Sequence, residues 1–186
     1  MNLEKMFEMQ KALDERIIKE KGLEGQDLLP NLILALQVEL AECANEWRGF
    51  KHWSNDREPR TKHPLETSPN GAFRKGGNPL LEEYVDCLHF ILSIGNRLGW
   101  NDTDTIDDVV VQHLISEKGF DTAKTFSCLL SIAYGFHFSN VEKRTYISLF
   151  TTFFELGNKL GFKWEQIEAA YMDKNAVNHQ RQQEGY

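Results

Sequence analysis

The chain has little cysteine, and what it has is not arranged for cross-linking. Its 186 residues include only three cysteines, an odd number with no C-x-x-C pair. Cys43, Cys87 and Cys128 lie instead within segments whose apolar spacing is helical. Cysteines used in this way are typical of reduced thiols in a protein core rather than of a disulfide scaffold. We therefore expect a cytoplasmic protein.

Long hydrophobic runs and basic runs are also lacking. No segment is apolar enough to span a bilayer, and the first residues have neither the charge order nor the apolar run of a signal peptide. The net charge is −7, without a sustained run of Lys or Arg. A broad nucleic-acid surface needs such residues to neutralise phosphates. The composition therefore argues against membrane and nucleic-acid partners, but it leaves room for a local basic cluster.

Proline is scarce except in one stretch. Residues 50–78 hold three of the five prolines together with Gly71, Gly76 and Gly77, and they show no periodicity. A structureless stretch of this length in a compact domain is usually functional or disordered. The length of the chain suits one domain. We expect a single domain over residues 1–186, with 50–78 as an irregular loop or lid.

The rest of the chain has helical spacing, bounded by caps and glycines. We see no convincing strand, so the fold class is predicted to be all-α, a helical bundle of about six or seven helices. The predicted helices cover residues 3–21, 30–48, 79–98, 103–118, 121–136, 141–160 and 164–182. The helix over 141–160 is apolar nearly all round, which indicates burial on more than one side. We expect a subunit interface there.

A weak internal repeat links two of these helices. Residues 94–100 (Ile-Gly-Asn-Arg-Leu-Gly-Trp) resemble residues 156–162 (Leu-Gly-Asn-Lys-Leu-Gly-Phe). In this register Glu83 and Asp86 correspond to Thr145 and Ser148. Convergence on a helix-ending signal is the alternative, and we favour duplication slightly.

Four carboxylates in two pairs carry most of the chemical information. Glu39 and Glu42 are three residues apart, as are Glu83 and Asp86, and residues with this spacing share a helix face. Both pairs lie in segments too apolar for a free surface, where a buried acid is costly unless it is paired or metal-bound. Two such helices side by side would set four like charges around one pocket. The pattern predicts a site for Mg²⁺, or Mn²⁺ as an alternative, which would in turn suit a polyphosphate.

Near its end the chain offers a second charged face. Lys174, Asn178 and Arg181 lie at i, i+4 and i+7, so an ammonium, an amide and a guanidinium share one helix face. The trio suits a phosphate chain. Cations in the last turns of any helix are also favoured by its dipole. Beside the four carboxylates, we interpret the trio as phosphate-binding.

These motifs together resemble the dimeric dUTPase family, within the all-α NTP pyrophosphatase (MazG-like) superfamily. The likeness spans almost the whole chain, although the paired acids define only the superfamily. The matching segments are Met9–Asp14, Glu39-x-x-Glu42, Phe50-Lys51-His52-Trp53, Glu83–Ser93 and Tyr171–Tyr186. One departure is the segment between Glu42 and Glu83, which is longer than is typical of the superfamily.

The resemblance implies a homodimer that hydrolyses dUTP to dUMP and pyrophosphate by a metal-activated water, with some action on dUDP. By position, the four acids would hold Mg²⁺, and Glu42 would also orient the attacking water. The phosphates would be held by Lys174, Asn178 and Arg181. The uracil would be surrounded by Gln10, Trp53, His89 and Phe90.

Other functions also fit the pattern. A relative acting on another nucleotide, such as dCTP or a damaged base, would keep the same metal and phosphate ligands. A non-catalytic helical dimer acting as an interaction module would carry the acids as surface charge. The aromatic residues could be core packing, and His89 could only brace Asp86.

Overall fold

Amphipathic helices make up most of the described chain. The computed structural model describes residues 2–68, 71–74, 76–103, 105–106, 121–138 and 141–185. These residues form six helices and one hairpin: α1 (Leu3–Lys21), α2 (Leu29–Trp47), β1 (Leu65–Ser68), β2 (Gly71–Arg74), α3 (Pro79–Leu98), α5 (Thr122–Gly135), α6 (Lys143–Lys159) and α7 (Trp164–Gln183). The all-α fold class is confirmed. The helix expected over 103–118 falls mostly outside the described residues.

Local caps set the ends of the best-predicted helices. The side chain of Asn2 accepts a hydrogen bond from the first turn of α1, and that of Asn78 does the same for α3. Gly22 and Gly99 follow these helices with φ of 64° and 68°. A left-handed φ is open to glycine without a steric penalty. Both helices therefore begin and end where the sequence predicted.

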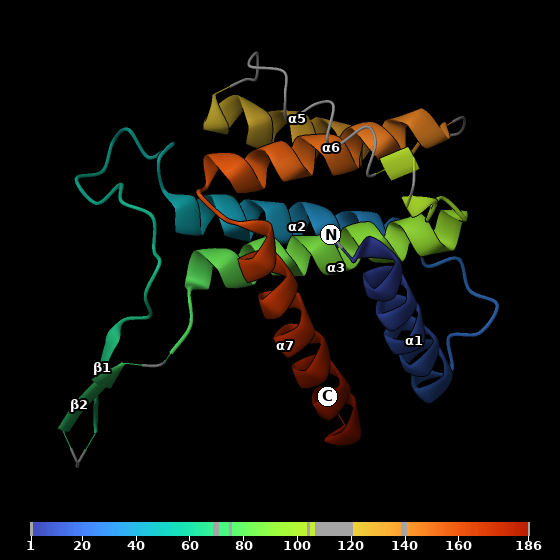
Figure 1. Ribbon diagram of the computed structural model, residues 1–186, viewed down its shortest axis with the longest axis horizontal. Helices are drawn as coiled ribbons and strands as arrows, with labels where there is room; N and C mark the ends of the chain where they lie inside the picture. Colours follow the sequence, from blue (N-terminus) through green and yellow to red (C-terminus); the bar gives the residue numbers. More distant parts are fainter. Residues whose placement is uncertain are drawn as a thin grey trace.

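The helices pack in layers around a central pair (Figure 1). α2 lies against α3 along most of its length, and α5 and α6 cover one side of this pair. α1 and α7 lie against α3 from the other side and diverge from it. Leu36, Leu40, Leu88 and Ile91 are fully buried where the central pair meets. Burying each such side chain contributes roughly 1.5–3 kcal/mol. The pair that carries the predicted acids is thus held together by a buried apolar seam.

Two tyrosines tie α3 and α6 together reciprocally. The Tyr84 hydroxyl donates to the Phe153 carbonyl at 3.0 Å, and the Tyr146 hydroxyl donates to the Ile91 carbonyl at 3.0 Å. In the register of the sequence repeat, Tyr84 corresponds to Tyr146 and Ile91 corresponds to Phe153. The two contacts are therefore the same contact made twice, with the roles of the helices exchanged.

The glycines of the repeat make room for these tyrosines. Gly157 packs against the ring of Tyr84, and Gly95 packs against the ring of Tyr146. A Cβ at either glycine would run into the phenol. The sequence repeat therefore has a structural counterpart in a pseudo-twofold arrangement of α3 and α6, which supports duplication over convergence.

The apolar helix expected at a subunit interface lies inside the chain. Tyr146, Leu149, Phe150 and Phe153 of α6 are all fully buried within a single copy. Neighbouring helices of the same chain, α5 and α3, already lie against α6. The prediction that a second subunit covers this helix was wrong, because an all-round apolar pattern reports burial without saying what provides it.

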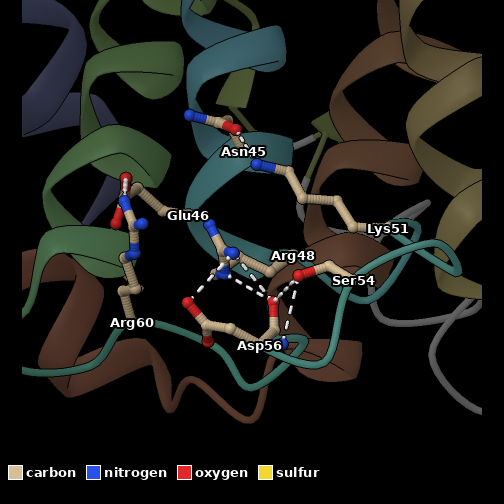
Figure 2. A network of polar contacts seen from close by, with 7 residues as sticks. All are labelled: Asn45, Glu46, Arg48, Lys51, Ser54, Asp56 and Arg60. Carbon is tan, nitrogen blue, oxygen red and sulfur yellow. Dashed lines mark hydrogen bonds and ion pairs between the residues drawn. The ribbon is translucent and has the colours of Figure 1, made fainter.

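An arginine fastens the segment that follows α2 (Figure 2). Arg48 ends the helix with φ of 64°, a conformation that costs roughly 1–2 kcal/mol for a residue with a Cβ. Its Nε and Nη2 donate to the Asp56 carbonyl at 3.0 and 2.8 Å, and Nη2 also pairs with Asp56 Oδ2 at 3.0 Å. Charge-assisted bonds from Arg48, a residue only 7% exposed, offset the strain. The chain is thereby drawn back against the end of α2.

The 50–78 stretch is consequently more ordered than predicted. Arg60 binds Glu46 through its backbone N–H (2.9 Å) and through its guanidinium (3.1 Å), as Figure 2 shows for the side chains. Further on, β1 and β2 form an antiparallel hairpin with Leu65 opposite Arg74. The expectation of no strand was wrong, because strands of four residues are too short to give a periodic signal among prolines and glycines. The use of this stretch as a lid stays a prediction.

Candidate active site

Three of the four predicted metal ligands meet where α2 faces α3. Carboxylate oxygens of Glu39, Glu83 and Asp86 all lie within 4.8 Å of one another. Glu42, almost one turn further along α2, is exposed, yet its charge contributes to raising the pKa of both Glu39 and Glu83. The structure therefore brings the four acids to one place, three of them tightly and one at the rim.

The cluster carries more negative charge than its surroundings compensate. Burial raises the pKa of Glu39 to about 7, and the charges of Asp86 and Glu42 add to the effect. Burial likewise raises the pKa of Glu83 to about 7, again with Asp86 as the next cause. Burial also raises the pKa of Asp86, while a hydrogen bond from Lys174 opposes the rise. Crowded oxygen ligands of this kind are what a hard divalent cation neutralises.

α7 presents the predicted phosphate ligands to this cluster. The Nζ of Lys174 lies 2.5 Å from Oδ2 of Asp86, with side chains 22% and 18% exposed. Asn178 and Arg181 line the adjoining pocket, and the charge of Arg181 acts to lower the pKa of Asp86. The cationic face of α7 therefore spans from the acidic cluster to the pocket.

The pocket itself is a cavity of about 700 Å³ between α1, α3 and α7. Its lining includes Phe90 and Ser93, which follow Glu83 and Asp86 along α3 at intervals of three or four residues. Residues at these intervals share a helix face. The acidic cluster and the pocket are thus successive parts of one face of α3.

A buried histidine forms the inner wall of the pocket. His89 is 5% exposed and stacks on Tyr171 with ring centroids 4.4 Å apart. Its Nδ1 donates to Oε1 of Gln10 at 2.6 Å, and the Tyr171 hydroxyl approaches the same oxygen at 3.1 Å. Burial, followed by the charge of Lys174, lowers the pKa of His89 to about 3, so the ring is neutral. With Nδ1 protonated, Nε2 offers a lone pair that has no partner among the described residues.

The structure adds Asp14 and Ser93 to the pocket, two residues to which sequence reasoning gave no role. The Nε2 of Gln10 donates to Oδ1 of Asp14 at 2.9 Å, and both residues line the pocket with Ser93. Burial raises the pKa of Asp14 to about 6, although hydrogen bonds with Gln10 and Ser93 act to lower it. The signal was present: Gln10 and Asp14 are four residues apart on one helix, and so are His89 and Ser93.

One predicted base contact lies elsewhere. Trp53 is 68% exposed and packs edge-on against Phe50 and His52, at centroid distances of 5.8 and 5.0 Å. It is not among the described residues that line the pocket, whereas the other three predicted base contacts are. The structure therefore brings Gln10, His89 and Phe90 together and leaves Trp53 on the surface beyond α2.

An acidic cluster, a cationic helix face and a nucleotide-sized pocket on helices alone define the class, an all-α hydrolase of nucleoside triphosphates. A family model described as dUTPase matches residues 2–67 and 71–186. The chain belongs to this family, the all-α dUTPases that its motifs resemble, and it is a dUTP diphosphatase. No curated protein matches the chain. Across the described residues, no helix is both long and apolar enough to cross a membrane.

Proposed function

We propose that the enzyme hydrolyses dUTP to dUMP and pyrophosphate with Mg²⁺ held by Glu39, Glu42, Glu83 and Asp86, and that it also acts on dUDP. The observation that carries the proposal is the approach of three carboxylates within 4.8 Å, with the pKa of Glu39 and of Glu83 raised to about 7. Protein groups alone leave these charges poorly compensated. Mn²⁺ suits the same oxygen ligands.

The acids of the cluster have different roles in the proposed reaction. Bound Mg²⁺ would supply Lewis acidity toward a phosphate oxygen and toward water. A water oxygen forms a bond to the α-phosphorus, while the bond from that phosphorus to the bridging oxygen breaks and pyrophosphate leaves. Glu42, exposed beside the other acids, orients the water and takes its proton. With dUDP the same displacement releases phosphate.

α7 supplies charge where the reaction needs it. Lys174, Asn178 and Arg181 bind the phosphates and offset the negative charge that develops on the leaving group. The support is their position, since all three share the helix face between the acids and the pocket. Arg suits a bidentate contact and Lys a point contact.

The pocket chemistry matches a uracil ring. Uracil has an N–H donor with one carbonyl acceptor on each side of it. The unpaired Nε2 of His89 can accept from such a donor. Phe90, which is half-buried, offers an apolar face.

We extend the proposal to a homodimer in the cytoplasm. Trp53 does not line the pocket of its own chain, so we place its contact with the base across the dimer, from the second copy. Free cysteines support a reducing location. Sedimentation of a monomer at micromolar concentration, with and without nucleotide, would contradict the dimer.

Pyrophosphate release from dUTP, dCTP and dTTP, with Mg²⁺ and with a chelator, tests the activity. We expect release from dUTP only, and only with the metal. Glu83→Gln is expected to abolish it, while the matched control Glu165→Gln, an exposed acid at the start of α7, keeps wild-type turnover. Metal-independent turnover, or equal turnover of dCTP, would overturn the proposal.

A further inference from the structure

The acidic cluster already contains a cation that the chain itself provides. The ammonium of Lys174 lies 2.5 Å from Oδ2 of Asp86, although the two residues are 88 positions apart in sequence. Both side chains are largely buried, with exposed fractions of 22% and 18%. The pair therefore links α7 to the floor of the proposed metal site.

A divalent cation and this ammonium compete for the same ligand. Any ion bound jointly by Glu39, Glu83 and Asp86 would lie among oxygens that are within 4.8 Å of one another. The ammonium would then be a few ångströms from a doubly charged ion, where like charges repel strongly in a partly buried site. The ammonium occupies one oxygen of a carboxylate that the divalent cation would also use, so the two cations share a ligand.

The backbone of α7 is held in place independently of this pair. The buried Tyr171 hydroxyl donates toward the Met6 carbonyl at 3.0 Å, and its ring stacks on His89. The four-carbon side chain of Lys174 can therefore change partner while the helix stays where it is. One helical turn onward, the same face of α7 reaches the pocket through Asn178.

We propose that Lys174 is an exchangeable counter-ion of the metal site: its ammonium neutralises Asp86 until a divalent cation displaces it, and it then binds the substrate's phosphates. The inference rests on the proposed function and adds a coupling to it. Metal binding releases the lysine, so the metal prepares the phosphate-binding face as well as contacting phosphate itself.

The first test measures the metal alone. Calorimetric or paramagnetic-resonance titration with Mn²⁺, without nucleotide, is expected to show roughly tenfold tighter binding by Lys174→Met than by wild type, because the competitor is gone. Lys159→Met is the matched control. It removes the same charge from an ion pair on α6, with Glu155 at 3.2 Å, and should leave Mn²⁺ affinity and turnover unchanged.

The second test distinguishes a lysine that exchanges partners from a lysine whose charge attracts phosphate without leaving Asp86. We would measure affinity for a non-hydrolysable dUTP analogue, with nitrogen in place of the α,β-bridging oxygen, with and without Mg²⁺. If Lys174 must leave Asp86 to reach phosphate, Lys174→Met loses little affinity without metal and roughly tenfold or more with it. A lysine that acts only through its charge predicts the opposite order, because Mg²⁺ already neutralises phosphate.

The outcomes distinguish this inference from the proposed function. Glu83-dependent Mn²⁺ binding and dUTP hydrolysis by wild type, with unchanged or weaker Mn²⁺ binding by Lys174→Met, would overturn the exchange alone. An equal nucleotide loss with and without Mg²⁺ would also overturn it. Absence of both metal binding and hydrolysis in wild type would overturn the proposed function, and the exchange with it.

Discussion

Asp14 permits a quantitative test of the pocket. Its pKa is raised from 3.8 to about 6, chiefly by burial. The folded state therefore favours the neutral acid more than the unfolded state does. The stability this contributes is fully present below the unfolded pKa and is lost as the pH rises through the folded one. This stabilising contribution should therefore disappear between about pH 4 and pH 6, below the physiological pH range.

Asp14→Asn removes this penalty and keeps the local geometry. Asn retains an Oδ1 acceptor for the Nε2 of Gln10, which lies 2.9 Å away, but it cannot ionise. A pKa shift of about 2 units corresponds to roughly 3 kcal/mol, and water entry would reduce it, so we expect a gain of about 1–3 kcal/mol. Relative to wild type, the variant should be equally stable near pH 4 and more stable by this amount above pH 7.

Urea unfolding from pH 4 to pH 8, with a chelator present throughout, measures the effect. The difference between variant and wild type cancels the titration of the acidic cluster, which both proteins share. Asp173→Asn, at an exposed position on α7, is the matched control and should give a difference independent of pH. A variant that is less stable than wild type at pH 8, or a difference that does not change with pH, would refute the reasoning.

Three further substitutions test the site and the fold. Glu42→Gln should lower kcat by more than tenfold, which corresponds to about 1.4 kcal/mol of barrier, and should leave the circular-dichroism spectrum unchanged. If the variant keeps more than about a tenth of the wild-type kcat, Glu42 is not the base. Arg181→Ala should weaken a non-hydrolysable dUTP analogue roughly ten- to a hundredfold and leave deoxyuridine unaffected in calorimetry, whereas equal losses would indicate a structural role. Gly157→Ala should destabilise the protein by about 1–3 kcal/mol in urea, because its Cβ would meet the Tyr84 hydroxyl at 2.5 Å. Gly135→Ala, which meets nothing within 4 Å, is the control and should be neutral or stabilising.

Helix ends were predictable where the signal was local. Asn78, Pro79 and Gly99 cap α3 through neighbouring residues, so its bounds could be read from the sequence. The end of α2 was predicted to within one residue, but the capping residue is Arg48 and not the glycine that follows, because Asp56 stabilises the left-handed conformation of Arg48 through a tertiary contact. The interface assigned to residues 141–160 failed for a different reason: the apolar pattern of α6 shows that the helix is buried, but not that α5 and α3 of the same chain bury it.

The site shows the same division between local and tertiary information. Each acid pair could be predicted because a helix brings residues three apart to one face. That the two pairs lie close together was inferred from helix packing. In the structure, Glu39 of α2 does lie close to Glu83 and Asp86 of α3. The pairing of Lys174 with Asp86 had no sequence signal, because it depends on where α7 docks.

α3 and α6 make reciprocal contacts, but of these two helices only α3 carries the candidate site. Thr145 and Ser148 stand on α6 where Glu83 and Asp86 stand on α3, so the counterpart face has no acids. α1 and α7, which supply Gln10 and the cations, both lie against α3. A second acidic cluster on α6 would add like charges without a cationic helix beside it, at a cost that only another metal could offset. α3 and α6 therefore make reciprocal tyrosine contacts, but α1 and α7 both lie against α3, and the acids lie on the side of the fold where these helices supply Gln10 and the cations.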